Sequence, residues 1–269
     1  MVCCGDHRCQ CNSLCLFLVY SSPGISSGSK SWVEGLIGTD QIRLPLRLKE
    51  SASLENFFCE GNREAVGFLR SLIASEGPRV VFLHGPDGAG KSHLLQAYCR
   101  LTLHASKVPF YASLGMQESS PEMINGLEGA DTVCLDDVDA IASESRWEKA
   151  LFNLFETVME SDRQLILAGR YPPVHSGFAL QDLTTRLASG GVWAIKPLDE
   201  DELPQALRLR AGERGLEISD LVLGYLLRRV RRDSATLFNL LDQIDEQAFA
   251  HQRRLTVPFV RDLAARLLD

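Results

Sequence analysis

The feature that most restricts which folds this chain can adopt is the run at 85–92, Gly-Pro-Asp-Gly-Ala-Gly-Lys-Ser. This is the spacing G-x4-G-K-[ST] of a phosphate-binding loop, in which glycines let backbone N–H groups turn inward around phosphates. An apolar run at 80–84 precedes the loop, and a helical pattern at 92–105 follows it. A strand, a turn and a helix in this order point the positive end of the helix at the loop. The sequence therefore predicts a phosphate site here.

Individual residues of the loop have separate expected roles. Gly85, Gly88 and Gly90 are expected to shape the backbone around the phosphates. Lys91 is expected to reach the terminal phosphates, and the Ser92 hydroxyl is expected to ligate Mg²⁺. A bare motif can also arise in any glycine-rich loop, so the flanking strand and helix are what favour the functional interpretation.

A second candidate element is the run Thr-Val-Cys-Leu-Asp-Asp at 132–137. The predicted buried strand at 132–135 is followed directly by two acids. This order places Asp136 at the carboxyl end of the strand, at the edge of the sheet, where it can hold Mg²⁺ through water. Asp137 is predicted to orient the attacking water. Apolar runs that end in acids are common, and Asp is also a frequent helix N-cap, so a structural role for Asp137 is the alternative.

The remaining pattern predicts an α/β core at 52–197 and a small helical lid at 198–269. Apolar runs alternate with amphipathic stretches in the core, which indicates a parallel sheet with helices on both faces. The strands are expected at 80–84, 109–112, 132–135, 164–168 and 192–195, and the core helices at 63–74, 92–105 and 147–161. After Pro197 the spacing is helical, with helices expected at 201–214, 220–231, 234–250 and 258–268.

Residues 1–38 differ in composition from the rest of the chain. They contain five of the eight cysteines and a Ser/Gly-rich run, and we interpret them as disordered or as a spurious extension. A metal site is the less favoured alternative, because the spacing matches no paired C-x2-C motif. The apolar run at 14–20 is too short to span a membrane. The scatter of the other three cysteines is typical of a reducing, cytoplasmic location.

Residues 39–51 contain an apolar strip with a proline, Gln-Ile-Arg-Leu-Pro-Leu at 41–46. Such a segment is usually a linker, and that is one interpretation. The alternative is an extended ligand for a hydrophobic groove. In that case the contacts would come from Gln41, Leu44, Pro45 and Leu46.

Arg186 precedes the last predicted strand, in the run Asp-Leu-Thr-Thr-Arg-Leu at 182–187. An exposed arginine is usually solvated or paired with a carboxylate such as Asp182. A functional alternative comes from family resemblance alone: an arginine finger, a cation that stabilises negative charge on the γ-phosphate of a nucleotide held by a neighbouring chain.

Residues 40–269 resemble the DnaA-related family of AAA+ proteins. The loop continues as Gly-Lys-Ser-His93-Leu-Leu, which is the DnaA-type ending, and Leu-Asp136-Asp137-Val-Asp is similar to the family's acidic strand. The run 54–62, with Phe58 and Asn62, is similar to its nucleotide-base box. The resemblance implies an AAA+ core with a helical lid that binds ADP or ATP, with Phe58, Asn62 and His93 as contacts.

Within this family the chain is most similar to the Hda group, the regulatory inactivators of the initiator DnaA. The strip at 41–46 is similar to the Q-x-x-L-P-L motif with which this group binds the sliding clamp, the β subunit of DNA polymerase III, and no helix-turn-helix domain follows the lid. The resemblance implies that the nucleotide-bound protein docks on a DNA-loaded clamp and presents Arg186 to ATP-bound DnaA, which hydrolyses its ATP. Replication initiation is thereby inhibited. The family also allows a homo-oligomer, and no membrane partner is implied.

The net charge of −7 agrees with this role, because it argues against non-specific attraction to nucleic acid. Two positions depart from the family pattern. Ala235 stands where the lid usually offers an arginine, with Arg232 as the alternative cation, and Ala-Gly-Arg at 168–170 replaces a polar or acidic sensor. Both predict weak ATP turnover by the chain itself. A stand-alone ATPase such as a helicase loader, and a non-catalytic adaptor of initiator and clamp, stay open as alternatives.

Overall fold

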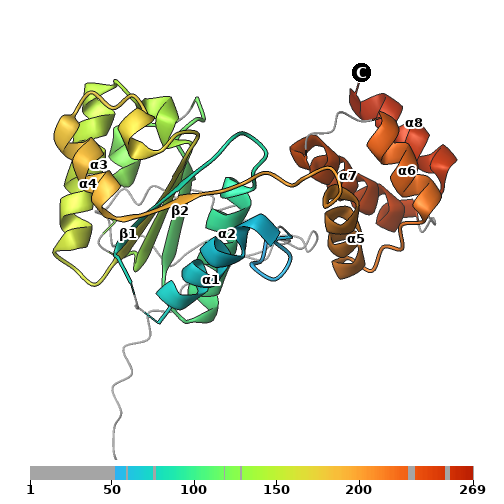
Figure 1. The fold of residues 1–269 in the computed structure, drawn as a ribbon, viewed down its shortest axis with the longest axis horizontal. Helices are drawn as coiled ribbons and strands as arrows, with labels where there is room; N and C mark the ends of the chain where they lie inside the picture. Colours follow the sequence, from blue (N-terminus) through green and yellow to red (C-terminus); the bar gives the residue numbers. More distant parts are fainter. Residues whose placement is uncertain are drawn as a thin grey trace, which may run out of the picture. The chain divides into compact units, whose positions relative to one another are not determined.

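A computed structural model of the chain describes residues 52–58, 60–74, 77–117, 119–127, 129–229, 234–251 and 255–268 (Figure 1). The predictions for residues 1–38 and 39–51 lie outside these described residues, and so does the one for Arg232.

The core is a five-stranded parallel sheet with the strand order β2-β3-β4-β1-β5. Its three central strands are apolar runs whose residues are nearly all buried, as expected where both faces of a sheet are covered. The strands are β1 (Val80–His84), β2 (Pro109–Ser113), β3 (Thr132–Asp136), β4 (Gln164–Gly169) and β5 (Gly191–Ala194). The predicted parallel sheet is therefore confirmed.

Successive residues of β1 face opposite sides of the sheet and belong to different hydrophobic clusters. Phe82 packs in the cluster formed with α3 (Ser145–Met159) and α4 (Gln181–Ser189). Leu83 packs in the cluster formed with α1 (Arg63–Leu72) and α2 (Lys91–His104). Figure 1 shows these helix pairs on opposite faces of the sheet. The predictions did not include α4, nor the short 3-10 helices at Glu60–Asn62, Pro121–Ile124, Val138–Ile141 and Pro173–His175.

The described part of the lid contains four helices: α5 (Leu203–Glu213), α6 (Asp220–Arg229), α7 (Ser234–His251) and α8 (Val257–Leu268). They confirm the predicted helical lid and enclose a hydrophobic cluster of their own, with Leu207, Leu226 and Leu241 at its centre. A network of ion pairs borders this cluster, in which Asp242 pairs with Arg214 at 2.8 Å. None of the described helices is long and apolar enough to cross a membrane.

Candidate functional site

The loop between β1 and α2 has the backbone that its glycines predict. Gly88 and Gly90 have φ angles of +77° and +92°, in the left-handed region that favours glycine. A Cβ on Gly90 would lie 2.6 Å from the Phe57 ring, and one on Gly85 would collide with the Ile195 carbonyl. All three predicted glycines are therefore required by backbone conformation or by close approach of a neighbour.

Lys91 is held inside this loop. Its Nζ donates hydrogen bonds to the carbonyl oxygens of Gly85, at 2.7 Å, and Pro86, at 3.0 Å. The residue is only 8% exposed. Carbonyl dipoles do not cancel its charge, so the ammonium can act on an anion in the loop. The neighbouring His84 does not add a second cation, because burial lowers its pKa and the charge of Lys91 lowers it further.

The two predicted acids lie at the carboxyl end of β3. Asp136 is 1% exposed and accepts hydrogen bonds from the Tyr111 hydroxyl, at 3.0 Å, and from the Asp137 N–H, at 3.1 Å. Burial raises the pKa of the Asp136 carboxyl, while a hydrogen bond from Ser92 lowers it. Ser92 and Asp136, the two predicted magnesium ligands, are therefore brought together.

Asp137 has a φ of 55°, which is unusual for a residue with a side chain. Its carboxylate accepts a hydrogen bond from the Ser113 hydroxyl at 2.7 Å and makes no capping bond to the 3-10 helix that follows. The geometry does not support the N-cap alternative. Asp137 instead lines the same cavity as Lys91.

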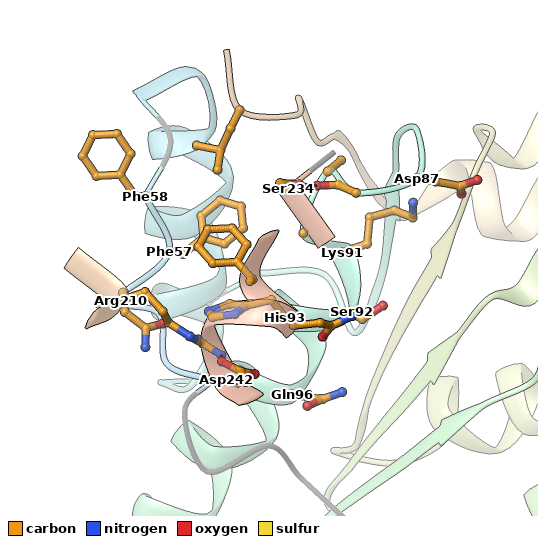
Figure 2. Close-up of a pocket in the computed structure, with 18 of the residues that line it drawn as sticks. Phe57, Phe58, Asp87, Lys91, Ser92, His93, Gln96, Arg210, Ser234 and Asp242 are labelled. Carbon is orange, nitrogen blue, oxygen red and sulfur yellow. Dashed lines mark hydrogen bonds and ion pairs between the residues drawn. The ribbon is translucent and has the colours of Figure 1, made fainter. Parts of the chain in front are cut away.

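A cavity of about 300 Å³ lies beside the loop (Figure 2). Phe58 and His93 line it, as predicted for nucleotide contacts. The His93 ring lies 5.7 Å from the Phe57 ring, and its Nε2 lies 2.9 Å from the Ser53 carbonyl oxygen. Of the predicted site residues the cavity wall also includes Gly88, Gly90, Lys91, Ser92 and Asp137.

Asn62 is not placed in the wall of this cavity. Its side chain is 2% exposed and holds the backbone of Lys196, where the core leads into the lid. The Asn62 amide donates to the Lys196 carbonyl at 2.8 Å, and its oxygen accepts from the Lys196 N–H at 2.9 Å. In the structure Asn62, a member of the predicted base box, therefore fixes the backbone of the segment between the core and the lid.

Replacing Asn62 by alanine is expected to lower the free energy of unfolding by about 1–2 kcal/mol, because two partly buried hydrogen bonds to the backbone of Lys196 are lost. Urea denaturation followed by circular dichroism measures this change. Ser71→Ala is the matched control, since the Ser71 hydroxyl makes an exposed hydrogen bond within α1. Equal stability of the two variants would contradict this role of Asn62.

Arg186 lies on α4, away from the wall of the cavity. Its guanidinium forms an ion pair with Glu156 of α3 and stacks over the Phe152 ring, 4.7 Å from the centroid. The acid it contacts is therefore not Asp182, the partner suggested by sequence proximity. Both side chains of the pair are 41% exposed, so the guanidinium can still be reached from outside the molecule.

Comparison with known protein families agrees with this geometry. Residues 48–194 match the model of the bacterial DnaA ATPase domain, and this match spans more than half of the chain. The chain belongs to the DnaA-related family of AAA+ proteins. Residues 199–263 match the Hda lid domain, so a DnaA-type core is followed by an Hda-type lid. The resemblance predicted from the sequence is confirmed.

Solved structures show the same fold. Domain III of the replication initiation protein DnaA from Thermotoga maritima is 19% identical, with a TM-score of 0.67 over 81% of this chain and 98% of that chain. AMPPCP-bound DnaA from Aquifex aeolicus is 25% identical, with a TM-score of 0.60 over 76% and 68%. The RuvB Holliday junction branch migration motor of Thermotoga maritima is 17% identical, with a TM-score of 0.55 over 80% and 72%.

The departures from the DnaA-related pattern have a structural setting. At the end of β4, Arg170 forms an ion pair with Asp87 of the phosphate loop at 2.7 Å, and its N–H donates to Asp139. A Cβ on Gly169 would lie 3.0 Å from the Asp139 carboxylate, so a sensor side chain at this position would require Asp139 to shift. Ala235 is the second residue of α7.

Sequence reasoning missed the part of the cavity wall that the Hda-type lid supplies. Ser234, Phe238 and Asp242 line the cavity from one face of α7, and Arg210 lines it from α5. Arg210 is 6% exposed, and burial lowers its pKa, whereas the charge of Asp242 raises it. The spacing of four residues along 234–242 is the signal that could have indicated a shared face.

Proposed function

We propose that this DnaA-related protein binds ADP or ATP with Mg²⁺ and, on a DNA-loaded sliding clamp, stimulates ATP hydrolysis by DnaA. It would act as a negative regulator of replication initiation. The observation that supports nucleotide binding most directly is the loop itself, with Lys91 held at Gly85 and Pro86 beside the cavity. The family match and the Hda-type lid support the regulatory part.

The loop and its neighbours fit a nucleotide chemically. Backbone N–H groups at the start of α2, together with the Lys91 ammonium, would bind the phosphates. Phe57, Phe58 and His93 would form an aromatic wall for the base on the far side of the loop. An adenine nucleotide is favoured because the similar DnaA structure from Aquifex aeolicus binds AMPPCP.

Ser92 and Asp136 fit a magnesium ion that takes its other ligands from phosphates and water. The described residues hold no cluster of three or more His, Cys, Asp or Glu that could enclose a metal ion. An ion at this site would offset phosphate charge. Because burial raises the pKa of Asp136, its carboxyl would be protonated, and its hold on the cation lost, at a higher pH than is usual for Asp.

Stimulation of DnaA would depend on Arg186. The Phe152 ring and the Glu156 carboxylate hold its guanidinium at the surface of the core. A preorganised cation of this kind stabilises the charge that develops on a transferring phosphoryl group, and an arginine finger accelerates such reactions by about 10³–10⁵-fold. The hydrolysed ATP would be the one bound to DnaA.

The adaptor alternative is favoured by one observation, the pairing of Arg186 with Glu156. An exposed ion pair of this type is common and can be purely structural. An adaptor would recruit DnaA to the clamp without contributing a catalytic cation, and it would therefore tolerate the loss of Arg186.

The proposed function is tested by measuring hydrolysis of ATP pre-bound to DnaA, with and without DNA-loaded clamp and this protein. Stimulation that requires both is the expected result. Turnover of free ATP by the chain alone, at a rate that neither DnaA nor clamp changes, would instead identify a stand-alone ATPase.

Replacement of Gln41, Leu44, Pro45 and Leu46 by alanine is expected to abolish clamp binding with little change in melting temperature. Apolar side chains seated in a groove supply most of the affinity of such a peptide ligand. Surface plasmon resonance on immobilised clamp measures the binding, and differential scanning calorimetry measures the melting temperature. A large drop in melting temperature with clamp binding retained would show that the strip packs on its own protein.

A further inference from the structure

A hydrogen bond joins the lid to the phosphate loop across 146 residues of sequence. The hydroxyl of Ser234, the first residue of α7, donates to the carbonyl oxygen of Gly88 at 2.7 Å. A Cβ on Gly88 would lie 3.2 Å from the same hydroxyl, so the loop presents bare backbone to the lid at this point. Figure 2 shows Ser234 on the side of the cavity where Lys91 lies.

The orientation of the Gly88–Ala89 peptide explains why this carbonyl is available. The N–H of the same peptide, on Ala89, donates to the Pro86 carbonyl within the loop at 3.2 Å. In a trans peptide the N–H and the C=O point in opposite directions. An N–H directed into the loop therefore leaves the Gly88 carbonyl directed outward, where Ser234 meets it.

An anion in the loop and the lid hydroxyl would act on opposite ends of this one peptide. A phosphate oxygen that shares the Ala89 N–H with the Pro86 carbonyl, or takes its place, would polarise the peptide and make the Gly88 oxygen a stronger acceptor. By linkage, the Ser234 hydroxyl that donates to the Gly88 oxygen would strengthen the Ala89 N–H as a donor to the phosphate. Phosphate binding and the contact of the lid with the loop would therefore favour each other through a neutral hydrogen bond, which requires no charged group.

Ser234 shares one face of α7 with other residues of the cavity wall. Phe238 and Asp242 follow it at intervals of four residues on the same helix face, and both line the cavity. Asp242 pairs at 2.8 Å with Arg214, the residue that follows α5, so this face of α7 is tied to the remainder of the lid. A contact at the first residue of α7 would therefore hold this part of the cavity wall close to the phosphate loop.

We infer that Ser234 is a positioning residue that holds the Hda-type lid closed over the phosphate-bound loop. It does so by a neutral hydrogen bond, in a chain that has Ala235 where the family's lid offers an arginine. The inference rests on the proposed nucleotide binding and specifies how the bound nucleotide is retained.

The test is the dissociation rate of a fluorescent ADP analogue from the full-length protein, measured by stopped flow after mixing with excess ADP. Ser234→Ala is expected to release the analogue about fivefold faster, while the association rate changes less than about twofold. Ser234→Thr keeps the hydroxyl and is expected to restore a rate close to that of the wild type. A merely structural serine would not produce this separation of rates or this rescue.

Two further outcomes distinguish the inference from the proposed function. If the wild type does not bind the analogue, the proposed function fails, and this inference fails with it. If the wild type binds and Ser234→Ala releases the analogue at the wild-type rate, only the role of Ser234 is overturned. Equal acceleration in Ser234→Ala and Ser234→Thr would also overturn it, because the hydroxyl would then be irrelevant.

Discussion

Lys91→Ala is expected to weaken the binding of ADP and of ATP by about 100-fold, since the loop loses a charged donor to the phosphates. The effect should be large because the ammonium is nearly buried and already held at the loop by Gly85 and Pro86. Fluorescence anisotropy of a labelled ADP measures the affinity. Circular dichroism should show unchanged helix content, because the loop's backbone is set by its glycines.

Lys149→Ala is the matched control for this change. Lys149 is an exposed lysine on α3, so its loss alters the net charge equally without touching the loop. It should bind the nucleotide as the wild type does. Affinity of Lys91→Ala within twofold of the wild type would mean that residues 85–92 are not the nucleotide site.

The phosphate loop could be predicted because its requirements are local. The motif lies within eight residues, and Gly88 and Gly90 are required by left-handed φ angles of the loop's own backbone. The close approach of Ile195 to Gly85 and of Phe57 to Gly90, by contrast, comes from distant parts of the chain. The position of Asp136 at the carboxyl end of β3 could be predicted for a similar reason, because the apolar run of this strand stops at Asp136. The parallel sheet followed from the alternation of such runs with helical segments.

Other features depend on contacts that no local pattern contains. Helix α4 has nine residues and buries only Leu183 and Leu187, which is too weak a period to indicate a helix. The contact of Ser234 with Gly88 joins residues that are 146 positions apart in the sequence. Asn62 was assigned to the base from resemblance alone, whereas its buried amide bonds to the backbone of Lys196.

The partner of Arg186 is a further example. Within its own helix the nearest acid is Asp182, one turn away, and sequence spacing suggested that pair. The structure pairs Arg186 with Glu156 because α3 and α4 pack side by side on the same face of the sheet. A surface ion pair contributes at most about 1 kcal/mol to stability. The loss of this pair should therefore change the stability of the fold little, and a role of Arg186 outside the chain stays a prediction.

Arg186→Ala is expected to leave the protein folded, nucleotide-bound and clamp-bound, and yet to lose most of its stimulation of DnaA. The guanidinium matters mainly in the transition state, where charge spreads over the transferring phosphoryl group, so the rate should fall by about 10³-fold while association changes little. Arg186→Lys should also fail substantially, because an ammonium cannot reproduce the planar fork. Single-turnover hydrolysis of labelled ATP pre-bound to DnaA, with clamp on nicked DNA, measures the rate.

Two controls separate a finger from a structural arginine. Arg63→Ala removes another exposed ion pair, that with Glu60, and should stimulate DnaA as the wild type does. Glu156→Gln removes the charge that pairs with Arg186 across α3 and α4 but retains the guanidinium, so a finger predicts that most stimulation survives. Equal losses in Glu156→Gln and Arg186→Ala would assign the effect to helix packing. Stimulation by Arg186→Ala within about twofold of the wild type would favour the adaptor, because recruitment to the clamp requires no cation at this position.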